Sequence, residues 1–311
     1  QDVLPLVGPG HNAALVKIGG TQAIVVSTTG GGLHTYGVDG KLMRSMEQGV
    51  FGPLSNATDR LGQMNLFESA SIGDLTGLGR PTVVKYGVSL LQVPNLLLVG
   101  INAPYNHLIG AYDAQTGVTL PAFPTVTDDY QFLSSSNIGK VVSGTSNQVL
   151  TGTGLGLLHA YDGITGQDAA GFPKVTGGWM FAPPELSQDG RIAAITREGY
   201  LYEWDVPTAP VCQPEWPTYR HDPHGSGNYD HDGPPPGALR EVKVERAGSE
   251  LKLAWVAPGD DGLCDEGNAD HYLVKLDGVA AEGMPAPAAA GTAQTATLAG
   301  AGDTGTITLQ A

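Results

Sequence analysis

The chain consists of short apolar stretches separated by polar, glycine-rich turns. Four of these stretches end in an aromatic residue, and a leucine or isoleucine stands three positions before each aromatic. The aromatic residues are Tyr36, Tyr112, Tyr161 and Trp204, and the aliphatic ones are Leu33, Ile109, Leu158 and Leu201. The pattern predicts four copies of one β-strand.

Two of these copies belong to a longer repeat. The pattern A-x-D-x-x-T-G occurs at 111–117 and again at 160–166, so its aspartates stand 49 residues apart, at 113 and 162. A Phe-Pro pair follows at the same offset, at 123–124 and 172–173. A period of about 40 to 50 residues built from short strands is typical of a β-propeller blade. We therefore predict an all-β chain with about four blades within residues 1–207.

The pattern changes after the last blade. Residues 208–237 are rich in Pro, Gly, His and Asp and lack alternation, which predicts a connector, and its Trp216 and Tyr219 favour a connector packed on the propeller. From 238 to 311 charged and apolar residues alternate with period two, most clearly at 241–245 and 251–255. This alternation predicts a small Ig-like β-sandwich with Trp255 in its core.

Composition supports the all-β prediction and narrows the class of partner. The 311 residues include 45 Gly and 22 Pro, which suit tight turns better than helices. The formal net charge of −15 argues against nucleic acid, whose phosphates need a basic surface. The longest apolar run, 96–99, is far too short for membrane insertion. The sequence opens on Gln1 without a signal peptide, so we expect upstream residues to have been removed or to lie elsewhere.

The chain has two cysteines, Cys212 and Cys264, too far apart for a zinc knuckle. We expect a disulfide between them, which would suit an extracellular protein, and two free thiols are the alternative.

Three segments resemble known bacterial families. The stretch 71–81, with Asp74, looks like the D-x-D-G-D-G strand opening of FG-GAP and PQQ-like propellers, and the A-x-D-x-x-T-G turns look like their blade ends. The stretch 216–224 is similar to a tail that follows such propellers in secreted bacterial proteins. The run L-A-W-V-A-P-G-D-D-G at 253–262 resembles the signature of bacterial fibronectin type III domains.

The resemblance implies a partial ring, because most such propellers close with six to eight blades. An N-terminal fragment or another chain would complete it. In FG-GAP blades the loop acids bind calcium, but here only Asp74 of the three acids is present. We therefore expect no cofactor, and calcium at Asp74 is the alternative. A quinone-dependent dehydrogenase is disfavoured because Pro121 and Ala170 replace the tryptophan that the resemblance implies after each turn.

Candidate site residues come from three patterns. Asp113, Asp162 and Asp205 each follow a strand-end aromatic, and we expect them to close β-turns. The irregular stretch 52–67 predicts a surface loop, in which Asn56, Asp59 and Arg60 are candidate binding residues. His221, His224 and His231 stand among aspartates in the connector, where a transition metal site and a structural clamp are the alternatives. No catalytic residue is assigned, since the sequence contains no G-x-S-x-G, H-E-x-x-H or P-loop motif.

These features lead to a functional expectation. We expect a secreted or surface-displayed bacterial protein, not an enzyme, in which propeller loops bind a protein or glycan at the cell surface and the sandwich is a spacer or attachment module. The alternative is the C-terminal accessory region of a secreted hydrolase, a serine peptidase, with its catalytic domain upstream.

Overall fold

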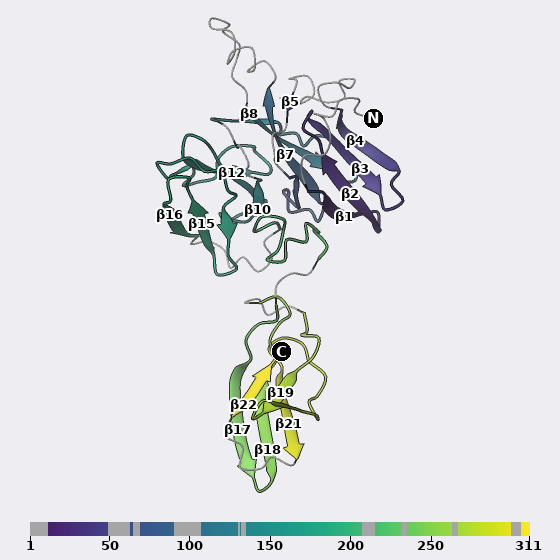
Figure 1. Ribbon diagram of the computed structural model, residues 1–311, viewed down its shortest axis with the longest axis vertical. Helices are drawn as coiled ribbons and strands as arrows, with labels where there is room; N and C mark the ends of the chain where they lie inside the picture. The colour runs from purple at the N-terminus through teal and green to yellow at the C-terminus, as the bar shows by residue number, and fades with distance from the viewer. Residues whose placement is uncertain are drawn as a thin grey trace, which may run out of the picture. The chain divides into compact units, whose positions relative to one another are not determined.

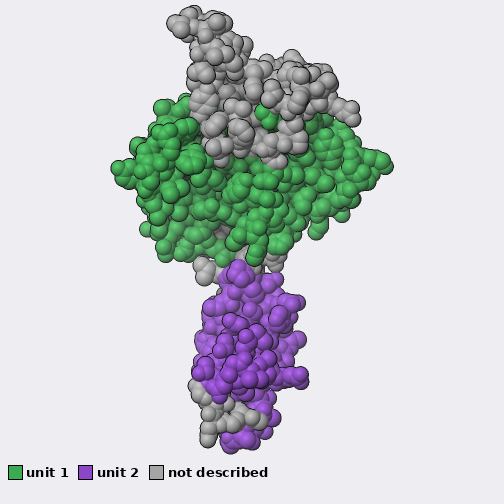
Figure 2. Space-filling view, viewed as in Figure 1, with its two compact units in different colours: residues 1–233 green, residues 234–311 purple. Residues whose placement is uncertain are grey.

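The computed structural model describes most of the chain. The described residues are 12–48, 63–64, 69–89, 107–129, 131, 135–206, 215–231, 235–262, 267–299 and 306–311. They contain β-strands and turns and no helix, so the all-β prediction is confirmed. None of these residues forms a helix long and apolar enough to cross a membrane. The chain divides into two compact units, Gln1–Gly233 and Pro234–Ala311 (Figure 2).

The described part of the first unit contains four antiparallel sheets in chain order (Figure 1). Blade 1 has the order β1-β2-β3-β4, with β1 (Ala14–Ile18), β2 (Thr21–Ser27), β3 (Gly32–Gly37) and β4 (Leu42–Gln48). Blade 2 has the order β5-β7-β8-β9, and β6 also pairs with β7; its strands are β5 (Gln63–Met64), β6 (Ser71–Gly73), β7 (Thr82–Ser89), β8 (His107–Asp113) and β9 (Thr125–Thr127).

The next two sheets repeat this meander. Blade 3 has the order β10-β11-β12-β13, with β10 (Asn137–Gly139), β11 (Gln148–Gly152), β12 (Leu157–Asp162) and β13 (Lys174–Val175). Blade 4 has the order β14-β15-β16, with β14 (Glu185–Leu186), β15 (Arg191–Ile195) and β16 (Leu201–Asp205). The strands β1, β6, β10 and β14, one from each blade, lie beside one another in this order. Sheets stacked side by side through one such strand each are blades of a β-propeller, as the repeat predicts.

The repeat explains why these residues form blades. In both copies the A-x-D-x-x-T-G turn is closed by the same bonds, since the amide of Gly117 donates to the carbonyl of Asp113 at 2.7 Å and the amide of Gly166 donates to that of Asp162 at 2.8 Å. Both glycines have a positive φ, +73° and +67°, a conformation that other residues rarely adopt. The Phe-Pro peptide bonds at 123–124 and 172–173 are both cis. The two copies therefore match in conformation as well as in sequence.

The second unit, where it is described, is a β-sandwich of two three-stranded antiparallel sheets. One sheet has the order β17-β18-β21, with β17 (Arg240–Ala247), β18 (Glu250–Val256) and β21 (Ala293–Ala299). The other has the order β20-β19-β22, with β19 (Leu273–Leu276), β20 (Val279–Ala281) and β22 (Ile307–Gln310). Leu251, Leu253 and Trp255 alternate inward along β18 and are at most 2% exposed, so the predicted role of Trp255 in the core is confirmed.

Candidate functional site

A cluster of histidines and aspartates lies in the propeller, with side chains from blades 2 and 3. It consists of His107 at the start of β8, Asp128 and Asp129 after β9, His159 in β12, and Asp168 in the turn that follows β12. We call this group the His–Asp cluster. Segments that connect rigid strands, such as the one after β9, are where scaffolds of this kind present binding groups.

His159 is held between two carboxylates. Its Nε2 lies 3.0 Å from Asp128 Oδ1 and its Nδ1 lies 2.8 Å from Asp168 Oδ2, while its ring stacks on Tyr161 with a centroid separation of 5.0 Å. Burial lowers the pKa of His159, but the two carboxylates outweigh burial and raise this pKa to about 9. The imidazole is therefore a fixed cation at neutral pH, which suits an electrostatic clamp and not a general base.

His107 behaves differently. Its Nδ1 lies 2.6 Å from the hydroxyl of Tyr86, and its Nε2 lies 3.9 Å from Asp129 Oδ1. Burial lowers the pKa of His107, and the partly exposed Asp129 and Asp128 offset that effect only in part. At neutral pH the cluster thus pairs a charged imidazole with one that tends to be neutral.

A group of exposed and half-buried side chains on blades 3 and 4 meets the cluster at Trp179, because a Cβ at Gly154 would lie 2.6 Å from Asp129 Oδ2 and 3.5 Å from Trp179 Nε1. We call it the rim, and it consists of Leu155, Trp179, Phe181, Arg197 and Tyr200. The Arg197 guanidinium stacks 4.9 Å above the Trp179 ring, and the amide of Arg197 donates to the Trp179 carbonyl at 2.8 Å. Tyr200 is 61% exposed and Leu155 is 63% exposed. Apolar groups that remain exposed next to fixed carboxylates are typical of a binding surface.

Residues 215–231, which we call the tail, hydrogen-bond to the inner edges of all four blades. The backbones of Trp216 and Ile138 exchange bonds of 2.8 and 2.9 Å, and the Pro217 carbonyl accepts the amide of Leu186 at 2.9 Å. The carboxylate of Glu215 accepts the amide of Asp74 at 2.9 Å. The amide of Leu15 in β1 donates to the carbonyl of Gly227 at 2.7 Å. Trp216 is 2% exposed, so the connector is part of the propeller core.

The carboxylate of Asp222 accepts several hydrogen bonds within the tail. It accepts hydrogen bonds from the amides of His224 and Ser226, at 2.9 and 3.2 Å, and from the Ser226 hydroxyl, while Nδ1 of both His221 and His231 lies 3.3 Å away. Burial raises the pKa of Asp222, but these donors outweigh it and lower this pKa to about 2. His221 has a φ of +80°, and its ring packs edge-on against Trp216. These contacts favour the clamp over the metal site for His221 and His231, while His224 contributes its backbone amide.

Asp74 is likewise bonded within its own loop. Its carboxylate accepts the amides of Thr76, Gly77 and Gly79 at 3.1, 3.0 and 2.5 Å. The structure does not bring Asp74 together with the tail histidines. Within the described ranges no three His, Cys, Asp or Glu side chains are arranged to hold a metal ion.

The other sequence-based candidates have varied positions. Asp113 Oδ1 accepts the amide of Thr116 at 2.7 Å, and Asp162 Oδ1 accepts those of Ile164 and Thr165 at 3.1 and 2.9 Å, so both close their own turns. Asp205 is the last residue of β16, and most of the segment after it is not described. Five candidates lie outside the described residues: Asn56, Asp59, Arg60, Cys212 and Cys264.

Sequence reasoning missed three buried contacts. It did not identify the His–Asp cluster, the Glu215 contact with Asp74, or the ion pair between Lys85 in β7 and Glu47 in β4, whose side chains are both 1% exposed with 2.6 Å between Nζ and Oε2. A lysine inside the apolar strand T-V-V-K-Y was the available signal, since such a charge needs a buried partner. Tyr219 was expected to pack but is 44% exposed.

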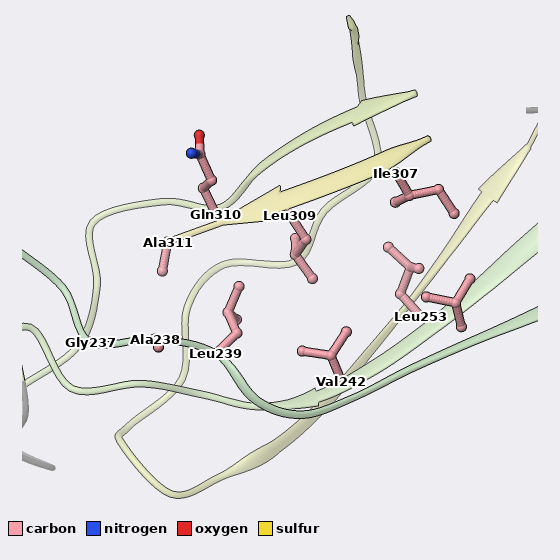
Figure 3. A pocket seen from close by; sticks show the side chains of 10 residues that line it. Gly237, Ala238, Leu239, Val242, Leu253, Ile307, Leu309, Gln310 and Ala311 are labelled. Atoms are coloured by element: carbon pink, nitrogen blue, oxygen red, sulfur yellow. The ribbon is translucent and has the colours of Figure 1, made fainter. Parts of the chain in front are cut away.

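An apolar groove lies in the sandwich between β17 and β22 (Figure 3). Its volume is about 720 Å³, and Leu239, Val242, Val244, Leu253, Ile307 and Leu309 supply its apolar lining.

Comparisons with known proteins give no assignment. No protein-family model and no curated protein matches the chain. The computationally designed Ika4 protein aligns with 66% of this chain and 98% of its own at 14% identity and a TM-score of 0.37. The Dos1 propeller aligns over 93% and 67% at 10% identity and 0.40, and BamB from Moraxella catarrhalis over 63% and 58% at 13% identity and 0.30. These scores are low, so the propeller assignment depends on the sheets described above.

Proposed function

We propose that the chain is an extracellular, non-catalytic binding protein of bacterial surface type. In this proposal the blades are of the FG-GAP or PQQ-like kind, the rim binds a protein or glycan, and the sandwich is a fibronectin type III-like spacer. The blade-end turns and the L-A-W-V-A-P-G-D-D-G run that begins in β18 support the two family assignments. The alternative, an accessory region of a secreted hydrolase, predicts the same blades. Sequencing the gene upstream of the codon for Gln1 distinguishes the two, because a protease domain there would favour the alternative.

One observation carries the binding proposal. Arg197 stacks on Trp179, and a Cβ at Gly154 would lie 2.6 Å from Asp129 Oδ2 and 3.5 Å from Trp179 Nε1, so this stacked pair stands next to the His–Asp cluster. The exposed Phe181 and Tyr200 follow Trp179 and Arg197 closely in the chain. Aromatic faces pack against the apolar faces of sugars or against apolar side chains, and ordered carboxylates accept hydroxyl or amide hydrogens without further ordering cost. The polar groups of the His–Asp cluster are already bonded to one another, so the geometry favours a preorganised surface over a reacting centre.

The test compares rim variants for binding to defined polysaccharides. The intact chain and its Tyr200→Ser/Phe181→Ser variant are mixed with insoluble cellulose, chitin and peptidoglycan, and the bound fraction is measured after sedimentation. Val38→Ser is the matched control, because Val38 is 69% exposed on blade 1, away from the rim. We expect retention on at least one polymer, a loss of tenfold or more in the double variant, and no change in the control. Equal retention of both variants would exclude the rim as the glycan-binding surface.

A further inference from the structure

Each blade has two faces, which the stacking of the propeller distinguishes. The register places one row of side chains across the strands of each blade on the same side. In blade 2 this row is Ile72, Val83 and Tyr112, in blade 3 it is Ile138, Val149 and Tyr161, and in blade 4 it is Leu186, Ile192 and Trp204. We call the face with this row the leading face and the opposite one the trailing face.

Blades stack with one trailing face against the next leading face. The trailing residues Val25 and Leu33 of blade 1 share a core with the leading row of blade 2. The trailing residues Leu150, Leu158 and Ala160 of blade 3 share a core with Leu186 and Ile192 of blade 4. In blades 2 and 3 every residue of the leading row is at most 4% exposed.

The leading face of blade 1 has the types of residue that are buried between the other blades, but no blade among the described residues covers it. Its row, read from the same register, is Leu15, Ile24, Tyr36 and Leu42. The first three are only half-buried, and Leu42 is 56% exposed. The composition of the row matches the covered rows of blades 2 and 3, while its exposure does not; in the row of blade 4 only Trp204 is half-buried. Large apolar side chains left exposed together in one patch indicate an interaction surface.

The trailing face of blade 4 is of a different kind. Where blades 2 and 3 have a buried alanine, at 111 and 160, blade 4 has the exposed Glu203. Glu203 forms a 3.1 Å ion pair with Arg191, while Ile195 and Leu201 are paired on the same face and are 48% and 74% exposed. The ion pair distinguishes this face from the apolar trailing faces of the other blades. A second copy of this chain could cover blade 1 with its blade 4 only by burying Glu203 and Arg191.

We propose that the leading face of blade 1 is the docking surface for a further propeller blade, supplied by a partner polypeptide with an aliphatic trailing face. The chemistry of that partner follows from the blade interfaces of this propeller, in which valine, leucine, alanine and threonine face the row of aliphatic and aromatic residues. The inference is independent of the proposed glycan or protein binding, because the rim lies on blades 3 and 4.

The experiment covers the leading face of blade 1 with the trailing face of an added copy of blade 1. For this purpose a second copy of residues 12–48 is fused ahead of residue 12 of the full chain, through a Gly/Ser linker as long as the segment between β13 and β14. Ile24→Cys is introduced in the original blade 1, and the alkylation rate of the new thiol is measured by mass spectrometry of the peptide that holds residue 24. Val149→Cys reports the rate at a covered row. The control fusion has Thr35→Glu in the added blade, which mimics Glu203.

We expect the thiol at position 24 to react at least tenfold faster than the thiol at position 149 in the unfused chain, independently of protein concentration. In the fusion it should react at the slow rate of position 149, and in the Thr35→Glu control the fast rate should return. Slow alkylation of the thiol at position 24 in the unfused chain would overturn the proposal, since the face would already be covered. Alkylation of the unfused chain that becomes slower as the protein concentration increases would also overturn it, and would assign the face to a second copy of this chain. Unchanged fast alkylation in the fusion would also overturn it.

Discussion

Replacing His159 with glutamine should remove most of the pH dependence of stability between pH 6.5 and 9. The folded-state pKa of His159 is about 9 against a reference value of 6.5, so the native state binds more protons than the unfolded state in this window. The linked stability is fully present below pH 6.5 and is lost as the pH rises through 9. At about 1.4 kcal/mol per pKa unit, the loss is about 3 kcal/mol.

Glutamine is the matched substitution because its amide, like a neutral imidazole, can donate to Asp128 or Asp168 without a charge. The free energy of unfolding is measured by urea titration with tryptophan fluorescence at pH 6, 7, 8 and 9.5. The variant should be less stable than the parent at pH 6 by about 3 kcal/mol and nearly as stable at pH 9.5.

The control for this prediction is His271→Gln, since the His271 side chain is 74% exposed on the sandwich and its loss should not alter the profile. Parallel profiles for the parent and His159→Gln across the whole range would refute the assignment of His159 as a buried cation.

Three further variants test other buried contacts. Lys85→Met should lower the free energy of unfolding in urea by about 3–5 kcal/mol, because it leaves Glu47 charged and buried. The double variant Lys85→Met/Glu47→Leu should recover most of this loss. Equal instability of the single and double variants would contradict the ion pair. Burial raises the pKa of Glu215, so ionising this carboxyl lowers the stability of the parent as the pH rises above 4.5. Glu215→Gln should remove this decrease and leave the free energy of unfolding at pH 7 unchanged or higher. A marked loss of stability at pH 7 in the variant would show that the charge is needed. Gly110→Ala should lower stability by about 1–3 kcal/mol, because the added Cβ would lie 2.5 Å from the hydroxyl of Tyr112; an unchanged Tm would contradict this packing.

The fold could be read from the sequence because each blade repeats its own local chemistry. The glycine of each T-G pair, the aspartate that bonds its own turn and the strand-end aromatic all act within a few residues, so their spacing is visible in the chain. The alternation in β18 is local in the same way and correctly places Trp255 in the core.

The candidate site could not be read in this way because its contacts join distant segments. Asp128 stands 31 residues from His159, and Glu47 stands 38 residues from Lys85 on a neighbouring blade. For the tail histidines the sequence left a metal site and a structural clamp as alternatives, and in space the rings of His221 and His231 lie beside one carboxylate that already accepts several protein donors. Only stacking of the blades shows which charged groups meet.

Amide hydrogen exchange of the intact chain tests the central claim, that four equivalent blades are held together by the tail. We expect β8 and β12 to exchange slowly and with matching patterns. The amides of Trp216 and Tyr229, which donate to the carbonyls of Ile138 and Leu15, should exchange as slowly as the inner strands. Rapid exchange at both tail amides, or unlike protection of the two repeat copies, would contradict this claim.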